Sequence, residues 1–245
     1  MSELTRATPL RRVGHKGADL IAPGNTRASF DAALRAGVDM IEFDVLPEDH
    51  RQRATTRLLL AHDYEHDLRD AVTLEEGVAH LASEAFGDVE LDVDLKLPGY
   101  EQRVVKVLQD QGLVDRTIVS TQYMRSLVTV RALEPGLRLG WSVPRAKRDL
   151  TTSRLWLPLA LTVLAVWRRR LPGVATGHLR ERRIDAVMAH WRLVTPRLVK
   201  AIHDAGGELF VWTVDDAEKI ARFEAMGAHG VITNDPRLFD DARGT

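Results

Sequence analysis

The 245-residue sequence contains no cysteine, which excludes disulfide bonds and thiolate metal sites. Metal chemistry in this chain must therefore use carboxylates, imidazoles and water. The N-terminal stretch MSELTRATPLRR lacks an apolar core, so we expect no signal peptide and a cytoplasmic protein. The longest apolar run, 155–167, is well short of the roughly 20 residues that span a bilayer.

Charge is nearly balanced overall but unevenly distributed. The formal net charge is −1, yet ten Lys and Arg stand against two Asp and Glu between Arg145 and Arg183. This asymmetry indicates an anionic partner for the segment. No nucleic-acid recognition motif is visible and the basic segment is apolar at its centre, so we expect no nucleic-acid binding.

Short β-rich runs alternate with longer amphipathic runs along the chain. The run RLLLAHD is predicted to be the return arm of a hairpin that begins with the second strand. The alternation predicts an α/β fold, a (β/α)₈ TIM barrel formed by a single domain over residues 1–245. An apolar and basic insertion is expected between strands 5 and 6, at about residues 145–183. The eight principal strands are expected in LRRVGH, VDMIEFDV, VELDVDLKL, RTIVST, LRLGWSV, IDAVMAHW, ELFVWTV and GVITND.

Catalytic groups in such a barrel lie at the C-terminal ends of the strands. Glu42 and Asp44 are two residues apart on the second strand, so both side chains point to one side, which we take to be the lumen. Adjacent inward carboxylates repel each other unless a cation holds them, and oxygen ligands suit Mg²⁺ or Ca²⁺. The alternative is that one or both are capping or surface groups.

The third principal strand carries Asp92, Asp94 and Lys96 on one face. Charged side chains on a buried strand need partners. We predict that Asp94 completes a three-carboxylate cation site with Glu42 and Asp44, and that Lys96 faces an anionic substrate. A solvated strand face is the alternative, but a central barrel strand has no such face.

Polar or aromatic residues also end other strands. His15 and Lys16 follow the first strand, and His62 with Asp63 follows the hairpin arm. Trp212 in the seventh strand is expected either to wall or stack on a substrate pocket or to pack in the core. Two histidines near neutral pKa can divide the proton transfers of a hydrolysis.

Taken together, these motifs resemble the glycerophosphodiester phosphodiesterase family, within the PI-phospholipase-C-like phosphodiesterase superfamily. The segment GHKGADLIAPGNTRASFDAALRAGVDMIEFDV is similar to the family's opening, LLLAHD to its second histidine motif, and LDVDLKLPG to its Glu-x-Lys strand. The segments IVSTQY, VWTVDD and GVITNDP are similar to its later strands. The resemblance implies that His15 and His62 form an acid/base pair. It implies that Glu42, Asp44 and Asp94 bind a divalent metal. It also implies that Lys16 and Lys96 contact the phosphate.

The sequence departs from the family pattern at three positions. Lys16 stands where the family has an arginine, and Gly24 replaces the glutamate of Pro-Glu-Asn-Thr. Asp94 stands where the family has a glutamate. If the family's arginine and glutamate contact each other, the first two departures are linked, because changing both leaves no orphan charge.

The resemblance implies hydrolysis of glycerophosphodiesters to glycerol phosphate and an alcohol, with a cyclic phosphate as the intermediate. One alternative is a lyase that releases the cyclic phosphate as its product. The other is a non-catalytic phospholipid-binding module. His190 near the end of the sixth strand is expected to be packed or exposed rather than catalytic.

The segment RLWLPLALTVLAVWRRRLPG, 154–173, interrupts the regular alternation of predicted strands and helices. One interpretation is a helix buried against the barrel. A second is an insertion at the catalytic mouth that contacts the inner membrane face or holds an acyl chain, because tryptophans and arginines suit a membrane interface. This second interpretation favours lysophospholipid substrates. A third is a dimer contact, and nothing else in the sequence bears on the oligomeric state.

Overall fold

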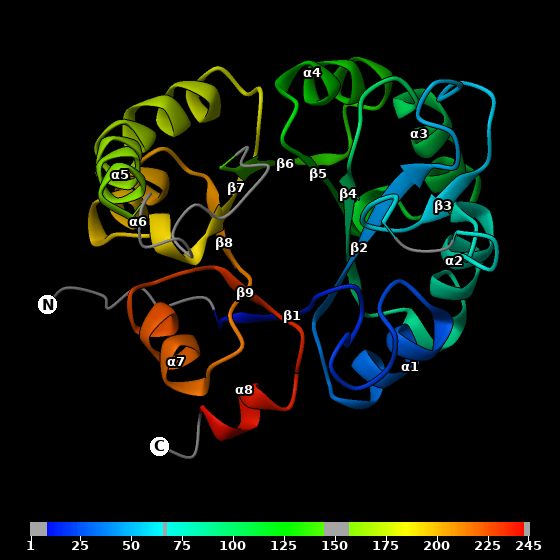
Figure 1. Cartoon of the computed structure of the whole chain (residues 1–245), viewed down its shortest axis with the longest axis horizontal. Helices are drawn as coiled ribbons and strands as arrows, with labels where there is room; N and C mark the ends of the chain where they lie inside the picture. Colours follow the sequence, from blue (N-terminus) through cyan, green and yellow to red (C-terminus); the bar gives the residue numbers. More distant parts are fainter. Residues whose placement is uncertain (1–8, 66–67, 145–156, 243–245) are drawn as a thin grey trace, which may run out of the picture.

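A closed barrel of parallel strands forms the centre of the protein, which we describe from a computed structural model over residues 9–65, 68–144 and 157–242. The first strand, β1 (Arg11–Gly14), pairs in parallel with both β2 (Met40–Pro47) and β9 (Gly230–Thr233), which closes the barrel. Figure 1 shows the helices arranged around these strands. The predicted (β/α)₈ fold is confirmed. The other parallel strands are β4 (Glu90–Leu95), β5 (Thr117–Thr121), β6 (Arg138–Val143), β7 (Ala186–His190) and β8 (Glu208–Trp212).

The predicted hairpin after the second strand is also present. Its return arm is β3 (Leu58–Leu60), which pairs antiparallel with β2 so that Val45 lies opposite Leu60. All three leucines of the arm are buried. The hairpin therefore carries the chain back along β2 from Pro47 to Val45, and His62 follows two residues after the arm.

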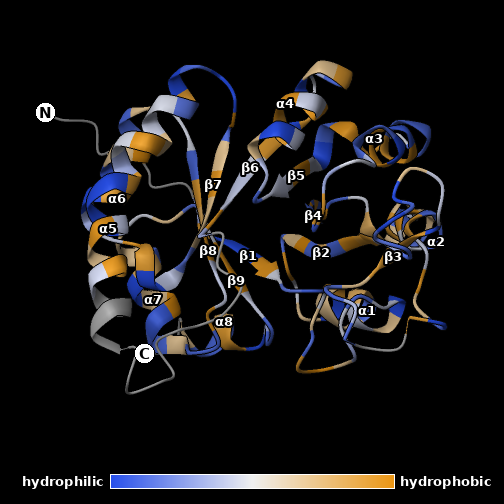
Figure 2. Cartoon of the chain, turned by 45° about the horizontal axis from the view of Figure 1, so that its top comes forward, coloured by the Kyte–Doolittle hydropathy of each residue, from blue (hydrophilic) through white to orange (hydrophobic). Residues whose placement is uncertain are grey.

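Local signals mark both ends of the first helix. The hydroxyl oxygen of Thr26 accepts a hydrogen bond from the Ser29 amide at the start of the first helix, and Gly37 after its end has a φ of 70°. Figure 2 shows alternating hydrophobic and hydrophilic bands along α5 and α6, typical of helices that cover a barrel on one side. The helices are α1 (Arg27–Arg35), α2 (Leu74–Leu81), α3 (Glu101–Asp110), α4 (Met124–Leu133), α5 (Leu157–Arg180), α6 (Pro196–Asp204), α7 (Ala217–Ala225) and α8 (Leu238–Asp241), with 3₁₀ turns η1 (Glu84–Phe86), η2 (Val114–Arg116) and η4 (Trp191–Leu193).

Alternation along the strands separates two cores. On β2, Ile41 and Phe43 face the helices and join the large outer core, whereas Met40 belongs to a small apolar cluster inside the barrel. Glu42 and Asp44 continue the inward face of Met40 toward the C-terminal end of the strand. The lumen is thus apolar in its middle and acidic at its C-terminal mouth.

A ring of charges fills the opposite end of the barrel. Arg11 pairs with Glu90 at 3.2 Å and with Glu208 at 2.5 Å, and Arg138 pairs with the same two carboxylates at 3.0 and 3.4 Å. The four residues come from alternate strands, which is how the interior layers of such barrels are built. No separate sequence pattern indicates this ring, because each member resembles an ordinary charged residue at a strand start.

The apolar segment lies partly in α5, while residues 145–156 fall outside the described part of the chain. Leu171 and Ala175 are fully buried against the barrel, but Val163 and Val166 keep 47% and 45% of their surface exposed. The interpretation of a helix packed on the barrel therefore holds for one side of α5. Within the described residues, no helix combines the length and the apolar character needed to cross a bilayer.

Candidate active site

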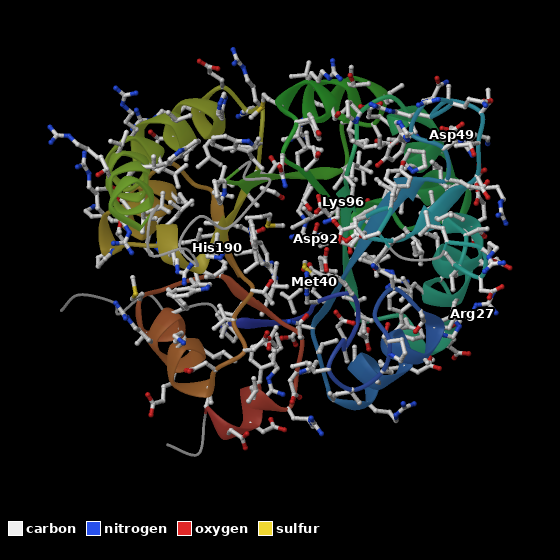
Figure 3. The ribbon with its side chains drawn as sticks, viewed as in Figure 1. Arg27, Met40, Asp49, Asp92, Lys96 and His190 are labelled. Atoms are coloured by element: carbon white, nitrogen blue, oxygen red, sulfur yellow. The ribbon has the colours of Figure 1, made fainter. Side chains whose placement is uncertain are left out.

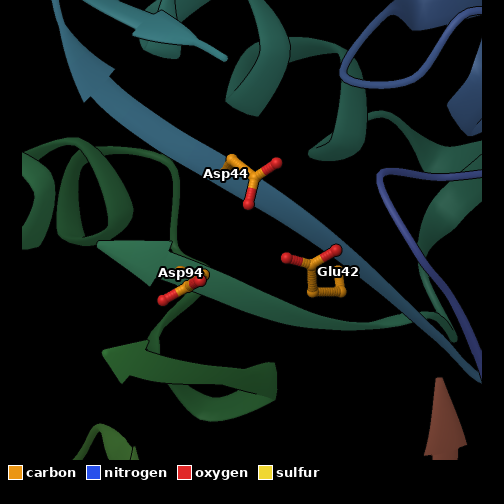
Figure 4. A group of neighbouring side chains, drawn as sticks. All are labelled: Glu42, Asp44 and Asp94. Atoms are coloured by element: carbon orange, nitrogen blue, oxygen red, sulfur yellow. The ribbon is translucent and has the colours of Figure 1, made fainter. Parts of the chain in front are cut away.

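Three carboxylates converge at the C-terminal mouth of the barrel. Glu42 and Asp44 project from β2, and Asp94 projects toward them from β4, where the strand register sets Asp94 opposite Asp44 (Figure 4). One ligand oxygen of each lies within 4.8 Å of those of the other two, and the described residues offer no other such group. The prediction that these side chains point inward and lie together is confirmed.

Lys96 supplies the counter-charge for this acidic group. Its Nζ is 2.6 Å from Asp94 Oδ2 and forms a close ion pair with Asp44 Oδ1. Burial alone would raise the pKa of Asp44, but the Lys96 ammonium, together with the two histidines and the Asn25 hydrogen bond, holds that pKa well below its usual range. Burial likewise opposes the charge on Lys96, yet Asp44 and Asp94 raise its pKa.

Lys96 offsets the charge of Glu42 only in part. Burial and the neighbouring charge of Asp44 raise the pKa of Glu42 well above its usual value. In addition, Asp94 Oδ1 is buried and has no hydrogen-bond partner among the described residues. Oxygen donors that repel one another and include an unpartnered atom fit a hard divalent cation. The residues present therefore suit the metal that the sequence predicts, with Glu42, Asp44 and Asp94 as the protein ligands.

Asn25 holds Asp44 in place, a role that the sequence did not reveal although the residue lies in the PGNT motif. Its Nδ2 donates to Asp44 Oδ2 at 2.9 Å, and its Oδ1 accepts from the Asp44 amide at 3.0 Å. Asn25 has a φ of 59°, a left-handed conformation that asparagine tolerates better than most residues. The loop after β1 thus contributes directly to the geometry of β2.

His15 lies at the end of β1 and reaches the same acidic group. Its Nε2 is 3.8 Å from Glu42 Oε2, and its Nδ1 is 2.5 Å from Asn234 Oδ1. Asn234 Nδ2 donates to Asp215 Oδ2 at 2.7 Å, so the Asn234 oxygen must be the atom that faces His15. His15 Nδ1 is therefore the protonated nitrogen, and Nε2 carries the lone pair on the side of the carboxylates. Burial lowers the pKa of His15, which favours the neutral ring.

Asn234 and Asp215 are functional candidates that our sequence reasoning missed. They lie in the segments GVITNDP and VWTVDD, which marked the family resemblance but carried no assigned role. Asp215 also accepts hydrogen bonds from the Thr233 hydroxyl at 2.9 Å and the Asn234 amide at 2.8 Å. Three bonds hold this carboxylate, and through Asn234 it fixes the orientation of His15.

Most of the predicted site residues line one small pocket. Figure 3 shows Asp92 and Lys96 at the centre of the barrel, away from the peripheral Arg27 and Asp49. The pocket measures about 160 Å³. Asp92, which shares a strand face with Asp94 and Lys96, also lines the pocket, and burial raises its pKa to about 7. The predicted site residues that line the pocket are His15, Glu42, His62, Asp94, Lys96 and Trp212.

The second histidine is more open than the first. The His62 side chain is 52% exposed, and its Nδ1 lies 3.0 Å from Asp63 Oδ2. Trp212 walls the pocket, and its Nε1 donates to the Met188 carbonyl at 2.8 Å. His190 packs edge-on against Trp212 at 5.1 Å and does not line the pocket, consistent with the expectation that it is not catalytic.

Lys16 lies beside the site rather than in its lining. Its backbone amide donates to Glu42 Oε2 at 2.9 Å, while its Nζ is 3.3 Å from Asp19 Oδ2. The amide of Gly24 donates to the other oxygen of Asp19 at 2.9 Å. Asp19 thus supplies the carboxylate for Lys16, and a Cβ at Gly24 would stand only 2.5 Å from Asp19 Oδ1. Asp19 therefore contacts both positions at which the sequence departs from the family pattern.

Comparison with known proteins agrees with this geometry. A sequence model described as the glycerophosphoryl diester phosphodiesterase family matches residues 99–238. The chain belongs to this family. It is therefore an enzyme of the phosphoric diester hydrolases that act on glycerophosphodiesters.

Relatives cover almost the whole chain. A glycerophosphodiester phosphodiesterase of Caldanaerobacter subterraneus subsp. tengcongensis is 25% identical, over 91% of this chain and 93% of the relative. The structure of a glycerophosphodiester phosphodiesterase from Agrobacterium tumefaciens is 19% identical with a TM-score of 0.68, covering 96% of this chain and 100% of its own. A phosphodiesterase from Oleispira antarctica, solved with the product sn-glycerol-3-phosphate, is 21% identical with a TM-score of 0.69, covering 96% and 98%. These structural likenesses show the shared fold.

Proposed function

We propose that the protein hydrolyses glycerophosphodiesters to glycerol phosphate and an alcohol with the help of a divalent cation and two histidines. The observation that carries the proposal is the cluster of three facing carboxylates at the barrel mouth, two of which, Glu42 and Asp94, line one pocket together with both histidines. The solved relative with bound sn-glycerol-3-phosphate supports the same product class.

A phosphodiester is an anion, so its reaction requires positive charge around the non-bridging oxygens. A divalent cation held by Glu42, Asp44 and Asp94 would supply that charge. Lys96 adds a fixed positive charge at the same place, because it stays protonated beside Asp44 and Asp94. Asp44 stays ionised for the same reason, so the site keeps ligand charge at neutral pH.

The two histidines divide the proton transfers. His15 accepts a proton at Nε2, since Nδ1 already donates to Asn234. The proton comes from a glycerol hydroxyl of the substrate, whose oxygen then bonds to phosphorus. As the bond from phosphorus to the leaving alcohol breaks, His62 donates a proton to the departing oxygen. Water opens the resulting cyclic phosphate with the roles reversed.

A cyclising lyase would perform the first half of this reaction only. Phosphorus NMR of the products of glycerophosphocholine distinguishes the two outcomes. Accumulation of glycerol phosphate, with any cyclic phosphate transient, is the result expected for a hydrolase. Cyclic phosphate as the lasting product contradicts the hydrolase and supports the lyase.

Lysophospholipids are proposed as additional substrates, and α5 as a peripheral contact with the membrane surface. The support is the exposure of Val163 and Val166 on a helix that also carries three consecutive arginines, Arg168 to Arg170, which suits an anionic lipid surface. Sedimentation with anionic vesicles tests the contact. Binding that disappears in Val166→Asp is expected, and absence of binding by the intact protein contradicts it.

A further inference from the structure

A second cleft opens directly beside the catalytic pocket. It has a volume of about 640 Å³ and lies between the start of α4, the end of β6 and α5. Gln122 and Ser142 line both the cleft and the pocket, so the two adjoin each other. The volume falls within the range of roughly 300–1,000 Å³ that holds small-molecule ligands.

The walls of this cleft are apolar and aromatic. Tyr123 and Met124 come from the start of α4, Trp141 and Val143 from β6, and Trp167 from α5. Among the described residues that line it, the charged member is Arg125 and none is a carboxylate. A cationic headgroup would therefore meet a like charge without a counter-ion. A neutral apolar group suits the walls better.

The aromatic side chains are held by the fold and do not merely lie on the surface. Trp167 is partly buried against the outer core, one turn before the fully buried Leu171. At the next residue, the Arg168 Nε donates to the Arg192 carbonyl at 2.8 Å and ties α5 to the barrel. Trp141 packs edge-on against His178 at 5.2 Å. The cleft thus exists before any ligand binds.

We propose that this cleft binds the acyl chain of a lysophospholipid whose phosphodiester occupies the adjacent catalytic pocket, with Trp141 and Trp167 as specificity-determining residues. The inference rests on the proposed phosphodiesterase function and assigns the acyl chain of the proposed lysophospholipid substrates a binding site. It also gives α5 a role in substrate selection that is independent of membrane contact.

A chain-length series provides the first test. The substrates are glycerophosphocholine and lysophosphatidylcholines with short acyl chains, used below their micelle concentrations. If methylenes enter the cleft, kcat/KM rises about fourfold for each one added, as burial of a CH₂ group predicts. In Trp167→Ala and Trp141→Ala the gain per methylene is lost, while turnover of glycerophosphocholine is retained and reports correct folding.

Trp191→Ala is the matched control, because Trp191 is also partly buried against the core but does not line the cleft. This variant should keep the gain per methylene. A gain of the same size in wild type and in both cleft variants overturns the proposal. So does a wild-type kcat/KM that is independent of chain length.

Calorimetric titration with a short-chain lysophosphatidylcholine in EDTA separates this inference from the proposed function. Binding by wild type and Trp191→Ala, with loss in Trp167→Ala, supports the acyl site even if no substrate is hydrolysed. Failure of wild type to bind the lysolipid overturns the acyl site. Hydrolysis of glycerophosphocholine in that case leaves the phosphodiesterase function standing.

Discussion

Replacing Lys96 by methionine tests the charge balance of the site most sharply. The change removes the cation that contacts Asp94 Oδ2 at 2.6 Å and also pairs with Asp44, while preserving most of the side-chain volume. Removing one partner of a buried ion pair costs about 3–5 kcal/mol, because the remaining charge is buried without compensation. The Lys96 side chain keeps 16% of its surface exposed, so we expect the lower end, about 3 kcal/mol.

Thermal and urea unfolding in EDTA measure this loss. For a chain of this size, about 3 kcal/mol corresponds to a fall of roughly 6–12 °C in Tm. The loss should shrink as the pH is lowered toward the ordinary pKa of aspartate and glutamate, because protonation removes the uncompensated charge. Saturating Mg²⁺ or Ca²⁺ should restore stability in the variant, by about 2.7 kcal/mol at a hundredfold excess over Kd.

Lys106→Met is the matched control, because Lys106 pairs with Asp110 at 2.9 Å on the surface and its side chain is 71% exposed. Loss of such an exposed pair on one helix costs about 0.5 kcal/mol or less. The reasoning is refuted if Lys96→Met unfolds at the wild-type temperature in EDTA. It is also refuted if the two lysine variants lose the same stability.

Three further predictions concern the residues around the carboxylates. His15→Ala and His62→Ala should each lower kcat by about 10²-fold or more, and a near wild-type rate in either contradicts its proton-transfer role. Asn234→Asp should raise the His15 pKa and move the acid limb of the pH profile of kcat/KM to higher pH, since the base must be unprotonated; an unmoved limb contradicts the orientation of the ring. Gly24→Glu should lower activity, and Asp19→Ala should relieve that loss, because an added Cβ meets Asp19 Oδ1 at 2.5 Å; additive effects in the double-mutant cycle contradict this coupling.

The barrel and its acidic mouth were predictable because they depend on local periodicity. Alternation along VDMIEFDV and VELDVDLKL puts carboxylates on one face of each strand, and a barrel leaves that face inside. The two-residue spacing of Glu42 and Asp44, and of Asp94 and Lys96, therefore predicted that these side chains lie together inside the barrel. What the spacing could not show was that the Lys96 ammonium lies against the carboxylates themselves.

Contacts between segments far apart in sequence were beyond such reasoning. Asn234 contacts His15 although most of the sequence lies between the two residues. Only the closure of the barrel brings β9 beside β1. Asp19 lies close to Gly24 in sequence, but a loop gives no periodic signal for the direction of a side chain. The resemblance to the family pointed to Gly24, and only the structure points to Asp19 as the residue coupled to it.

The measurement that tests the central claim most directly is turnover of glycerophosphocholine by the purified protein in EDTA and after addition of Mg²⁺ or Ca²⁺. We expect negligible turnover in EDTA, recovery with a divalent cation, and no recovery in Glu42→Gln at the same cation concentration, because that variant removes one of the three clustered carboxylates. Full activity in EDTA, or a wild-type rate in Glu42→Gln, would contradict a metal-dependent phosphodiesterase built on these carboxylates.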